Sequence, residues 1–174
     1  KESLHVPDVL KVKHTLTRLI QTMKTPRYGP VLMDLPVNIQ MSSLEGLHPS
    51  RILSTRDHQK HTYDISKYVQ ESKRPLVIFG HGVKLAGATK EALDFVEKSG
   101  IPFLVSWGAF DICGTDHPLR LGSPGVYGDR YANYAIQNTD LLISIGSRLD
   151  SRQIGGNASL FSKHSKKIMV DIDD

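Results

Sequence analysis

The spacing of hydrophobic positions changes along the chain, and each change predicts a different element. Residues 8–22, DVLKVKHTLTRLIQT, place apolar side chains at helical spacing and predict a helix with Asp8 as its N-terminal cap. The run VLMDLP at 31–36 predicts a short buried strand that ends at Pro36. No strand is expected before this helix–strand unit, so the unit is predicted to lack a pairing partner. Residues 41–62 show no sustained period and predict a linker.

From residue 63 onward, strand and helix patterns alternate. Strands are predicted at 74–80, which is a continuous apolar run, and at 101–107, 140–146 and 166–173. The predicted helices lie at 63–72, 87–100 and 129–138, and a loop rich in glycine and proline occupies 107–128. Gly100 is the expected C-terminal stop of the second helix. Unbroken apolar strands are typical of sheets covered on both faces, and their alternation with helices predicts an α/β fold with a doubly wound parallel sheet.

Length and composition limit the class of protein. A chain of 174 residues suits one domain, or one domain with a piece of another, and the absence of an initiator Met favours a piece of a longer protein. No apolar run approaches the roughly 20 residues of a membrane span, so no membrane partner is expected. Cys113 is the single cysteine, so no internal disulfide is possible, which suits a cytoplasmic location. We interpret Cys113 as an inert small side chain and not as a nucleophile. The net charge of +4 comes from scattered basic residues, which argues against nucleic acid as a partner.

Candidate binding loops follow the predicted strands, because ligands of doubly wound sheets bind outside the carboxyl ends of the strands. The loop after the third strand, IGSRLDSRQIGG, carries charges at every second position. In an extended segment such positions face the same side, so Arg148, Asp150 and Arg152 are expected to present one face. That face would meet an anionic ligand, a neighbouring carboxylate or another subunit.

The loop after the first of these strands, FGHGVKLAGA, contains Gly80 and Gly82, with Gly87 at the start of the predicted helix. Backbone amides at such a point attract phosphate, but the glycine spacing differs from the nicotinamide fingerprint and no acid ends the next strand. A glycine turn without a ligand remains the alternative. Two further features are given structural interpretations: His58 and His61 have no evident third metal ligand, and Tyr127, Tyr131 and Tyr134 are expected to pack along a helix face.

Longer segments resemble the thiamine diphosphate-dependent enzymes. RYGPVLMDLPVNIQ resembles the segment that closes their pyrimidine-binding domain. RPLVIFGHGVKLAGA, DHPLRLGSPGVYGDRYANYAIQNTDLLISIGSRLDSRQIGG and IMVDID resemble successive segments of their central domain, with acetolactate synthase as the nearest type. The resemblance implies a C-terminal remnant of the pyrimidine-binding domain at 1–40, a linker at 41–62, and a Rossmann-like central domain at 63–174.

The resemblance also implies a function. The parent enzyme would bind thiamine diphosphate and Mg²⁺ outside this chain, act as a transferase or lyase on 2-oxo acid carbon–carbon bonds, and form a homodimer or homotetramer. This piece would be an inactive scaffold without catalytic or metal-binding residues, and its central domain would hold FAD or ADP. The residues that the resemblance assigns to cofactor binding are Arg27, Gly80, His81, Gly82, Gly122, Ser123, Arg148, Asp150 and Arg152.

The chain also departs from the family pattern. It has SWGAF where the FAD binders usually carry a Thr-Leu-Met-like segment, and GSPG where they carry GMHG, so Trp107 and Pro124 are expected to fill or reshape the flavin end. Two alternatives stay open: a stand-alone nucleotide-binding regulatory domain, and a relative of the 2-oxo acid decarboxylases with an empty central domain. An oxidoreductase with a nicotinamide Rossmann domain is disfavoured by the glycine spacing.

Overall fold

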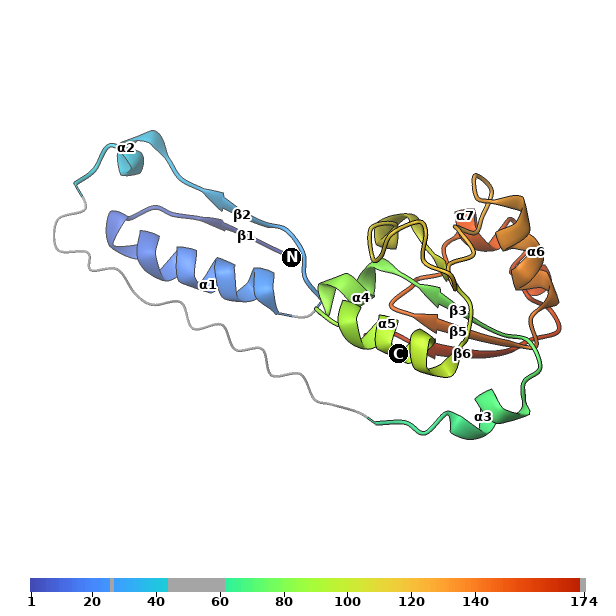
Figure 1. Cartoon of the computed structure of the whole chain (residues 1–174). Coiled ribbons are helices and arrows are strands. Elements are labelled where there is room, and N and C mark those ends of the chain that lie inside the picture. Colours follow the sequence, from blue (N-terminus) through green and yellow to red (C-terminus); the bar gives the residue numbers. More distant parts are fainter. Residues whose placement is uncertain (26, 44–61, 173–174) are drawn as a thin grey trace. The chain divides into compact units, whose positions relative to one another are not determined.

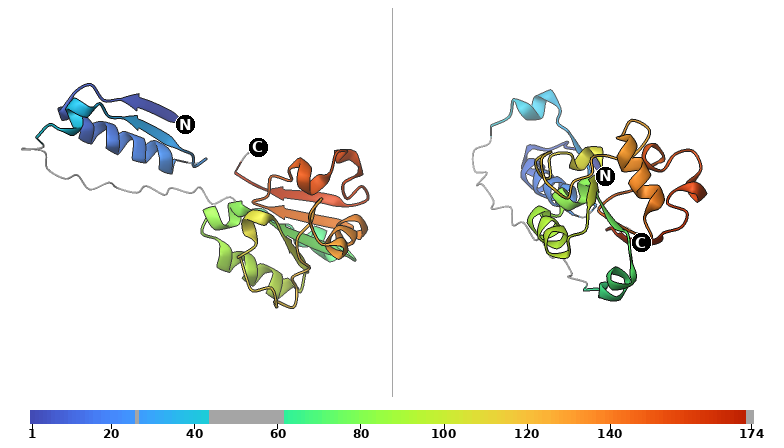
Figure 2. Two further views of the ribbon diagram at one scale, coloured as in Figure 1. Left: turned by 90° about the horizontal axis from the view of Figure 1, so that it is seen from above. Right: turned by 45° about the vertical axis from the view of Figure 1, so that its right-hand side comes forward.

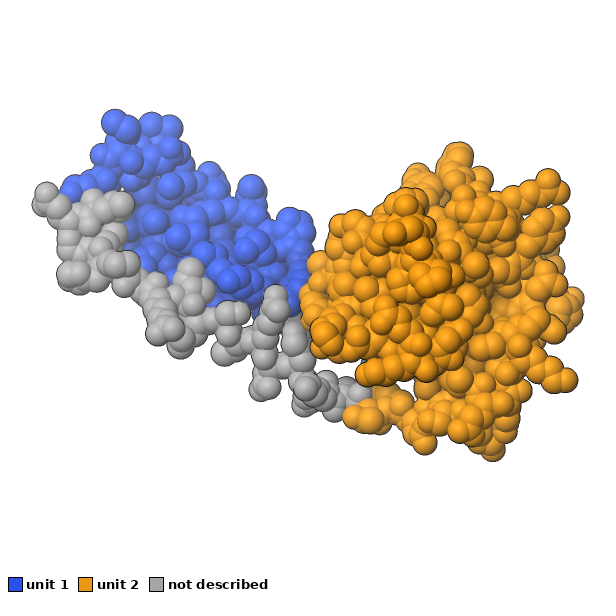
Figure 3. Space-filling model, in the orientation of Figure 1, with its two compact units in different colours: residues 1–61 blue, residues 62–174 orange. Residues whose placement is uncertain are grey.

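The computed structural model describes residues 1–25, 27–43 and 62–172. The chain divides into two compact units, Lys1–His61 and Thr62–Asp174 (Figure 3). Most of the predicted linker, residues 44–61, lies outside the described residues, and so do His58 and His61.

The first unit is a β–α–β arrangement. Its elements are β1 (Glu2–His5), η1 (Val9–Lys11), α1 (Val12–Lys24), β2 (Val31–Asp34) and α2 (Val37–Gln40) (Figure 1). β1 pairs with β2 in parallel, with Glu2 opposite Val31. The prediction that nothing pairs with this unit was therefore wrong. The sequence ESLH gave no strand signal because it is only four residues long and mixes polar with apolar positions.

Two features of the first unit are the cap before its first helix and the partial burial of β2. Asp8, the predicted cap, caps the 3-10 turn η1 that leads into α1, since its carboxylate accepts the N–H of Leu10 at 3.0 Å. Leu19 of α1 is fully buried, whereas Leu32 of β2 is 62% exposed. The expectation of a buried strand at 31–36 was wrong, because α1 covers one face of a two-stranded sheet and alternate side chains of β2 remain in solvent.

The second unit is a four-stranded sheet with helices on both faces. Its elements are α3 (Ser66–Glu71), β3 (Pro75–Phe79), α4 (His81–Leu85), α5 (Thr89–Ser99), β4 (Phe103–Val105), η2 (Trp107–Ala109), α6 (Arg130–Asn138), β5 (Leu141–Ile145), α7 (Ser151–Ile154), η3 (Ala158–Leu160) and β6 (Lys166–Val170). The strand order is β4-β3-β5-β6, and every neighbouring pair is parallel. The predicted doubly wound parallel sheet is confirmed.

The core of this unit is divided by the central strand β3. Val77 and Phe79 belong to one hydrophobic cluster with the inner face of α5, and the alternating Leu76 and Ile78 belong to a second cluster with α6. Figure 2 shows α5 and α6 on opposite sides of the sheet. Both faces of β3 are buried, which is why its sequence is an unbroken apolar run.

One helix of this unit was not predicted. α4 begins at His81, where the glycines of FGHGVKLAG indicated a turn. Gly87, expected to start a helix, has φ +68° and lies between α4 and α5 instead. Gly100 ends α5 in the left-handed conformation, as predicted.

The strand order places a topological switch point at β3 and β5. The chain passes from β3 to β4 on one side and then returns to β5 on the other side of β3. In open α/β sheets, ligands bind in the crevice outside the carboxyl ends of strands at such a point. The loops after β3, β4 and β5 therefore form the candidate site.

Candidate functional site

Backbone contacts join the loops after β3 and β5. The N–H of Gly80 donates to the carbonyl oxygen of Ile145 at 2.8 Å, and the N–H of Gly82 donates to that of Gly146 at 2.9 Å. A β-carbon on Gly80 would lie 2.0 Å from the oxygen of Gly146, so this crossing requires glycine. Both amides are engaged within the protein, which agrees with the alternative of a glycine turn that serves packing.

Side chains join the loops after β3 and β4. His81 Nδ1 lies 2.7 Å from the carbonyl oxygen of Gly108, and since a carbonyl only accepts, Nδ1 carries the proton in this contact. Lys84 Nζ lies 2.6 Å from Asp111 Oδ1, and its hydrogen bond is the main reason that the pKa of Asp111 is lowered. His81, predicted to contact a cofactor, thus holds η2 against α4.

The segment that carries Gly122 and Ser123 runs along the edge of β4. The N–H of Val105 donates to the carbonyl oxygen of Gly122 at 3.0 Å, which brings Ser123 to the carboxyl end of this strand. Asp129 Oδ2 accepts the N–H of Ser123 at 2.9 Å, and a β-carbon on Gly122 would lie 2.2 Å from that oxygen. Ser123 Oγ is buried and has no hydrogen-bond partner among the described residues.

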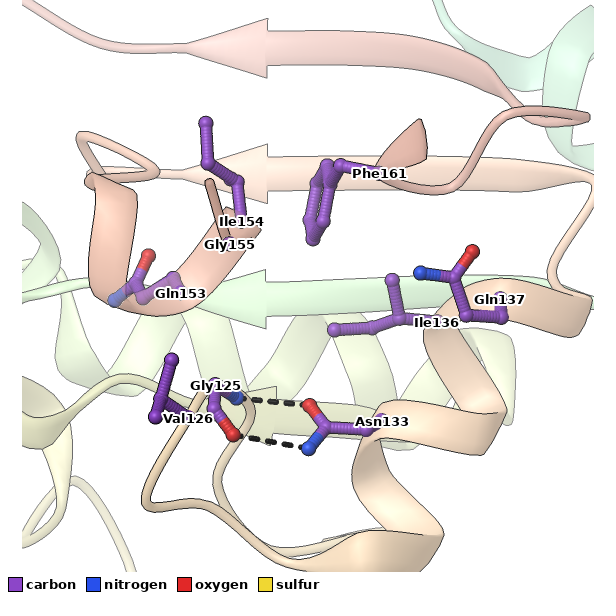
Figure 4. Close-up of a pocket in the computed structure, with 9 residues that line it drawn as sticks. All are labelled: Gly125, Val126, Asn133, Ile136, Gln137, Gln153, Ile154, Gly155 and Phe161. Carbon is purple, nitrogen blue, oxygen red and sulfur yellow. Dashed lines mark hydrogen bonds between the residues drawn. The ribbon is translucent and has the colours of Figure 1, made fainter. Parts of the chain in front are cut away.

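A second clamp holds the same loop from α6. The side-chain amide of Asn133 accepts the N–H of Gly125 at 2.8 Å and donates to its carbonyl oxygen at 2.9 Å (Figure 4). The N–H of Val126 donates to the carbonyl oxygen of Arg152 at 2.9 Å, so the loop is also tied to α7. A small cavity of about 220 Å³ lies at this junction. It is lined by Gly125, Val126, Asn133, Ile136, Gln137, Gln153, Ile154, Gly155 and Phe161.

The charged segment after β5 is folded differently from its expected extended form. Leu149 has φ +49° and α7 begins at Ser151, so the predicted alternation of three charges on one face was wrong. Asp150 caps α7 by accepting the N–H groups of Arg152 at 2.8 Å and Gln153 at 3.3 Å. A carboxylate used as a cap keeps the loop in place.

The two arginines of this segment extend into solvent. Arg148 and Arg152 are both exposed. Within residues 1–25, 27–43 and 62–172, neither guanidinium group forms a hydrogen bond or an ion pair. Guanidinium groups without a carboxylate partner are suited to a phosphate or carboxylate brought by a ligand.

The nine predicted site residues divide between the two units. Arg27 is exposed and lies in the first unit, before β2. The other eight lie in the second unit, in or beside the loops that follow β3, β4 and β5. The structure therefore places these eight residues near the carboxyl ends of the parallel strands, as the strand-end argument predicted.

Sequence reasoning missed the residues that shape this edge. Gly146, Asp129 and Asn133 were not singled out, because their partners are fixed only by the register of the sheet and by the packing of α6. It also assigned Tyr127, Tyr131 and Tyr134 to helix packing, which was wrong, since they are 77%, 61% and 57% exposed. The inner face of α6 is formed instead by smaller and aliphatic side chains that were not singled out, Ala132 and Ile136.

The described residues contain neither a metal-binding cluster nor a membrane-spanning helix. No group of three His, Cys, Asp or Glu side chains there could hold a metal ion. No helix in that part of the chain has the length and apolar character needed to cross a bilayer.

Comparison with known proteins gave consistent matches. The family model for the thiamine pyrophosphate enzyme central domain matches residues 63–174. The chain is 32% identical to a probable acetolactate synthase large subunit of Methanococcus aeolicus, in an alignment that covers 99% of this chain and 30% of that protein. It is 33% identical to the acetolactate synthase large subunit of Corynebacterium glutamicum, over 99% of this chain and 28% of that protein.

Two further matches have the same extent. The chain is 31% identical to 2-hydroxyacyl-CoA lyase 1 of Dictyostelium discoideum, over 98% of this chain and 29% of that protein. An X-ray structure described as a thiamin diphosphate-dependent enzyme from Mycobacterium smegmatis matches with a TM-score of 0.69 and 19% identity, over 97% of this chain and 33% of that one. That structural likeness supports the fold. The chain thus spans about a third of the length of the proteins it matches.

Proposed function

This chain belongs to the thiamine pyrophosphate enzymes, whose central domain it contains, and we propose that it is the central scaffold and adenine-nucleotide site of a 2-oxo acid enzyme. Its resemblance to acetolactate synthase, inferred from the sequence, is confirmed. In such an enzyme, thiamine diphosphate bound with Mg²⁺ supplies the carbanion chemistry at the 2-oxo acid carbonyl. The described residues contain no cluster that fits the metal, so no catalytic step is assigned to them.

The nucleotide role depends chiefly on Arg148 and Arg152. Both guanidinium groups are exposed beyond the carboxyl end of β5, and neither has a carboxylate partner in the described part of the chain. Two guanidinium groups match the charge and bidentate geometry of a diphosphate, which ADP and FAD share. Ser123 Oγ adds a buried hydroxyl without a hydrogen-bond partner among the described residues, at the neighbouring strand end. These residues fit an anionic nucleotide.

Ligand-dependent stability tests this role. A nucleotide that binds only the folded chain at 100 times its dissociation constant stabilises it by about 2.7 kcal/mol. ADP or FAD should therefore raise the melting temperature of the 174-residue chain, while adenosine, which lacks the diphosphate, should not. If neither ADP nor FAD shifts the melting temperature at millimolar concentration, the nucleotide role is excluded.

The reaction of the whole enzyme is tested on a full-length protein that carries these residues. With thiamine diphosphate and Mg²⁺, an acetolactate synthase should convert pyruvate to acetolactate. A second candidate is a 2-hydroxyacyl-CoA lyase, because the chain is 31% identical to one over 98% of its length. Release of an aldehyde from a 2-hydroxyacyl-CoA, with no acetolactate from pyruvate, would favour the second candidate.

A further inference from the structure

Cationic side chains gather where three strands of the second unit begin. Pro75 of β3 is paired with Leu141 of β5, and Leu141 is paired with Lys166 of β6, so the segments that precede these residues lie side by side. They come from distant parts of the sequence, which is why the basic residues seemed scattered along it. The exposed Lys and Arg side chains at this end, here called the amino-end cluster, are Lys67, Lys73, Arg74, Lys163, Lys166 and Lys167.

Helix α3 is fixed to this end of the strands (Figure 1). The carboxylate of Asp140, which precedes β5, accepts the N–H groups of Lys73 and Arg74, both at 2.9 Å. The ammonium group of Lys166 lies 4.1 Å from the centroid of the Tyr68 ring of α3. The cations of α3 and of the segment after it are therefore held beside those of β6.

The positive charge of the second unit is concentrated at this end. The six cations of the cluster are accompanied by two carboxylates, Glu71 and Asp140, which leaves a net charge of +4 there. The other described residues of the unit include seven Lys or Arg and nine Asp or Glu, a net charge of −2. A surface that is positive at one end and negative elsewhere attracts and orients an anionic partner.

Three cations of the cluster are positioned by neutral groups. Arg74 Nε donates to the carbonyl oxygen of Asn138 at 2.6 Å, and Lys167 Nζ donates to that of Ser162 at 2.8 Å. Lys166 lies over an aromatic ring. A neutral partner fixes the place of a charge without cancelling it, so these cations are pre-organised to bind an anion.

We propose that the amino-end cluster binds an acidic segment of a partner polypeptide. Adjacent strands lie about 4.8 Å apart, so the backbones of Arg74 and Lys166, two strands away from each other, are separated by about 10 Å. Carboxylates on alternate residues of an extended segment are about 7 Å apart, so three acidic residues reach both cations. The inference does not depend on the nucleotide role, because the cluster and the candidate site lie at opposite ends of the strands.

Two observations favour a polypeptide over nucleic acid. The carboxylates of Glu71 and Asp140 lie among the cations, and they would repel the closely spaced phosphates of a nucleic acid backbone more than a few separate carboxylates. The Tyr68 ring is covered on one face by Lys166, which hinders the stacking of a base on it.

The experiment measures the binding of a labelled hexaglutamate peptide to the 174-residue chain by fluorescence anisotropy at about 0.15 M salt. A hexaglutamine peptide is the uncharged comparison and should not bind. Lys73→Glu combined with Lys163→Glu should weaken the binding of hexaglutamate at least about tenfold. Both side chains are exposed, and neither forms a hydrogen bond or an ion pair with a described residue.

Lys11→Glu combined with Lys24→Glu is the matched control, because it makes the same change of charge at exposed lysines of the first unit. It should retain the affinity of the parent chain. Lys73→Gln combined with Lys163→Gln removes the two positive charges without placing a new acid beside Asp140. It should melt like the parent chain and lose affinity by a smaller factor than the glutamate variant.

Four results would overturn the inference. The first is a parent chain that does not bind hexaglutamate at this salt concentration. The second is an equal loss of affinity in the control variant, which would show that the peptide responds to total charge and not to the cluster. A short DNA duplex that binds more tightly than the peptide, and is lost with the same two lysines, would assign the cluster to nucleic acid. Displacement of the peptide by an equal concentration of inorganic tripolyphosphate would reduce the cluster to a general anion site.

Discussion

Gly80 and Gly146 meet across the carboxyl ends of β3 and β5, where a β-carbon on Gly80 would lie 2.0 Å from the carbonyl oxygen of Gly146. The meeting follows from the register of the sheet, since Phe79 is paired with Ile145 and each glycine is the next residue. A β-carbon on Gly146 would itself lie 2.6 Å from the nitrogen of Val83. Both sides of this crossing exclude a side chain, so the first residue after each strand is set by packing.

Gly80→Ala should therefore destabilise the second unit by about 1–3 kcal/mol, the usual cost of inserting a methyl group into a filled site. Urea unfolding measures the change. Gly156→Ala is the control, because a β-carbon there meets nothing within 4 Å, and it should be nearly neutral. Equal stability of the two variants would show that the loops separate at little cost.

Asn133→Ala should cost about 1–3 kcal/mol and loosen the loop that contains Gly125, because the N–H of that glycine loses its partner and its carbonyl oxygen keeps only the N–H of Gly128. Gln137→Ala, one turn further along the exposed surface of α6, has no such bond and should unfold like the parent chain. Hydrogen exchange at the amide of Gly125 measures the loosening directly. Unchanged protection in Asn133→Ala would mean that the contacts of the loop with Asp129 and with α7 are enough to hold it.

Asp150→Ala should lower stability by about 1 kcal/mol because it removes the cap of α7. Asp150→Asn retains an oxygen that accepts the N–H of Arg152, so it should keep most of that stability although it removes the charge. Thermal unfolding of the two variants separates capping from charge. If Asn and Ala were equally destabilising, the negative charge and not the cap would be the important feature.

The sequence predicts an element of this structure well when the element is buried on both faces, and poorly when it is short or half-exposed. The strands β3, β4 and β5 and the helix α5 were predicted because both faces of the sheet are covered and the apolar runs are unbroken. β1 and α4 were missed because one is short and half-exposed and the other begins between two glycines. In each case the local pattern was weaker than the tertiary contacts that stabilise the element.

The candidate site was predicted in its place but not in its details. The strand-end rule located the three loops, because it requires only the order of strands and helices. The use of Asp150 as a cap and the glycine crossing depend on backbone conformation and register, which a single sequence does not display. Leu149 at φ +49° illustrates this, since no local pattern indicates a left-handed leucine.

Asp140 makes the stability of the second unit depend on pH. The hydroxyl of Ser72, together with the N–H groups of Lys73 and Arg74, lowers the pKa of Asp140 to about 2 from its usual 3.8. A lowered folded-state pKa adds stability that is present above pH 3.8 and lost as pH falls toward 2. The shift corresponds to about 2 kcal/mol, which solvent screening at this partly exposed group reduces to about 1 kcal/mol.

Asp140→Asn should therefore destabilise the chain at pH 7, and the difference from the parent chain should disappear near pH 2. Urea unfolding between these pH values measures the difference. Ser72→Ala removes the leading cause of the pKa shift and should flatten the same curve in part. A difference between Asp140→Asn and the parent chain that is constant with pH would indicate a steric and not an electrostatic contribution.

Arg152→Ala tests the charge at the nucleotide site. If Arg152 binds a phosphate, it contributes a charge-assisted hydrogen bond of roughly 1.5–3 kcal/mol, and its loss should weaken ADP binding by about tenfold or more. The melting temperature without ligand should stay the same, because the exposed guanidinium group has no partner among the described residues. Lys163→Ala removes the same charge from the loop before β6, at the amino end of the strands, and should leave ADP affinity unchanged.

Melting curves of the parent chain, Arg152→Ala and Lys163→Ala, with and without ADP and FAD, distinguish phosphate binding from a structural role of Arg152. An equal ligand-induced shift in Arg152→Ala and the parent chain would exclude phosphate binding by Arg152. A lower melting temperature of the ligand-free variant would instead assign Arg152 to stability or to contact with another subunit.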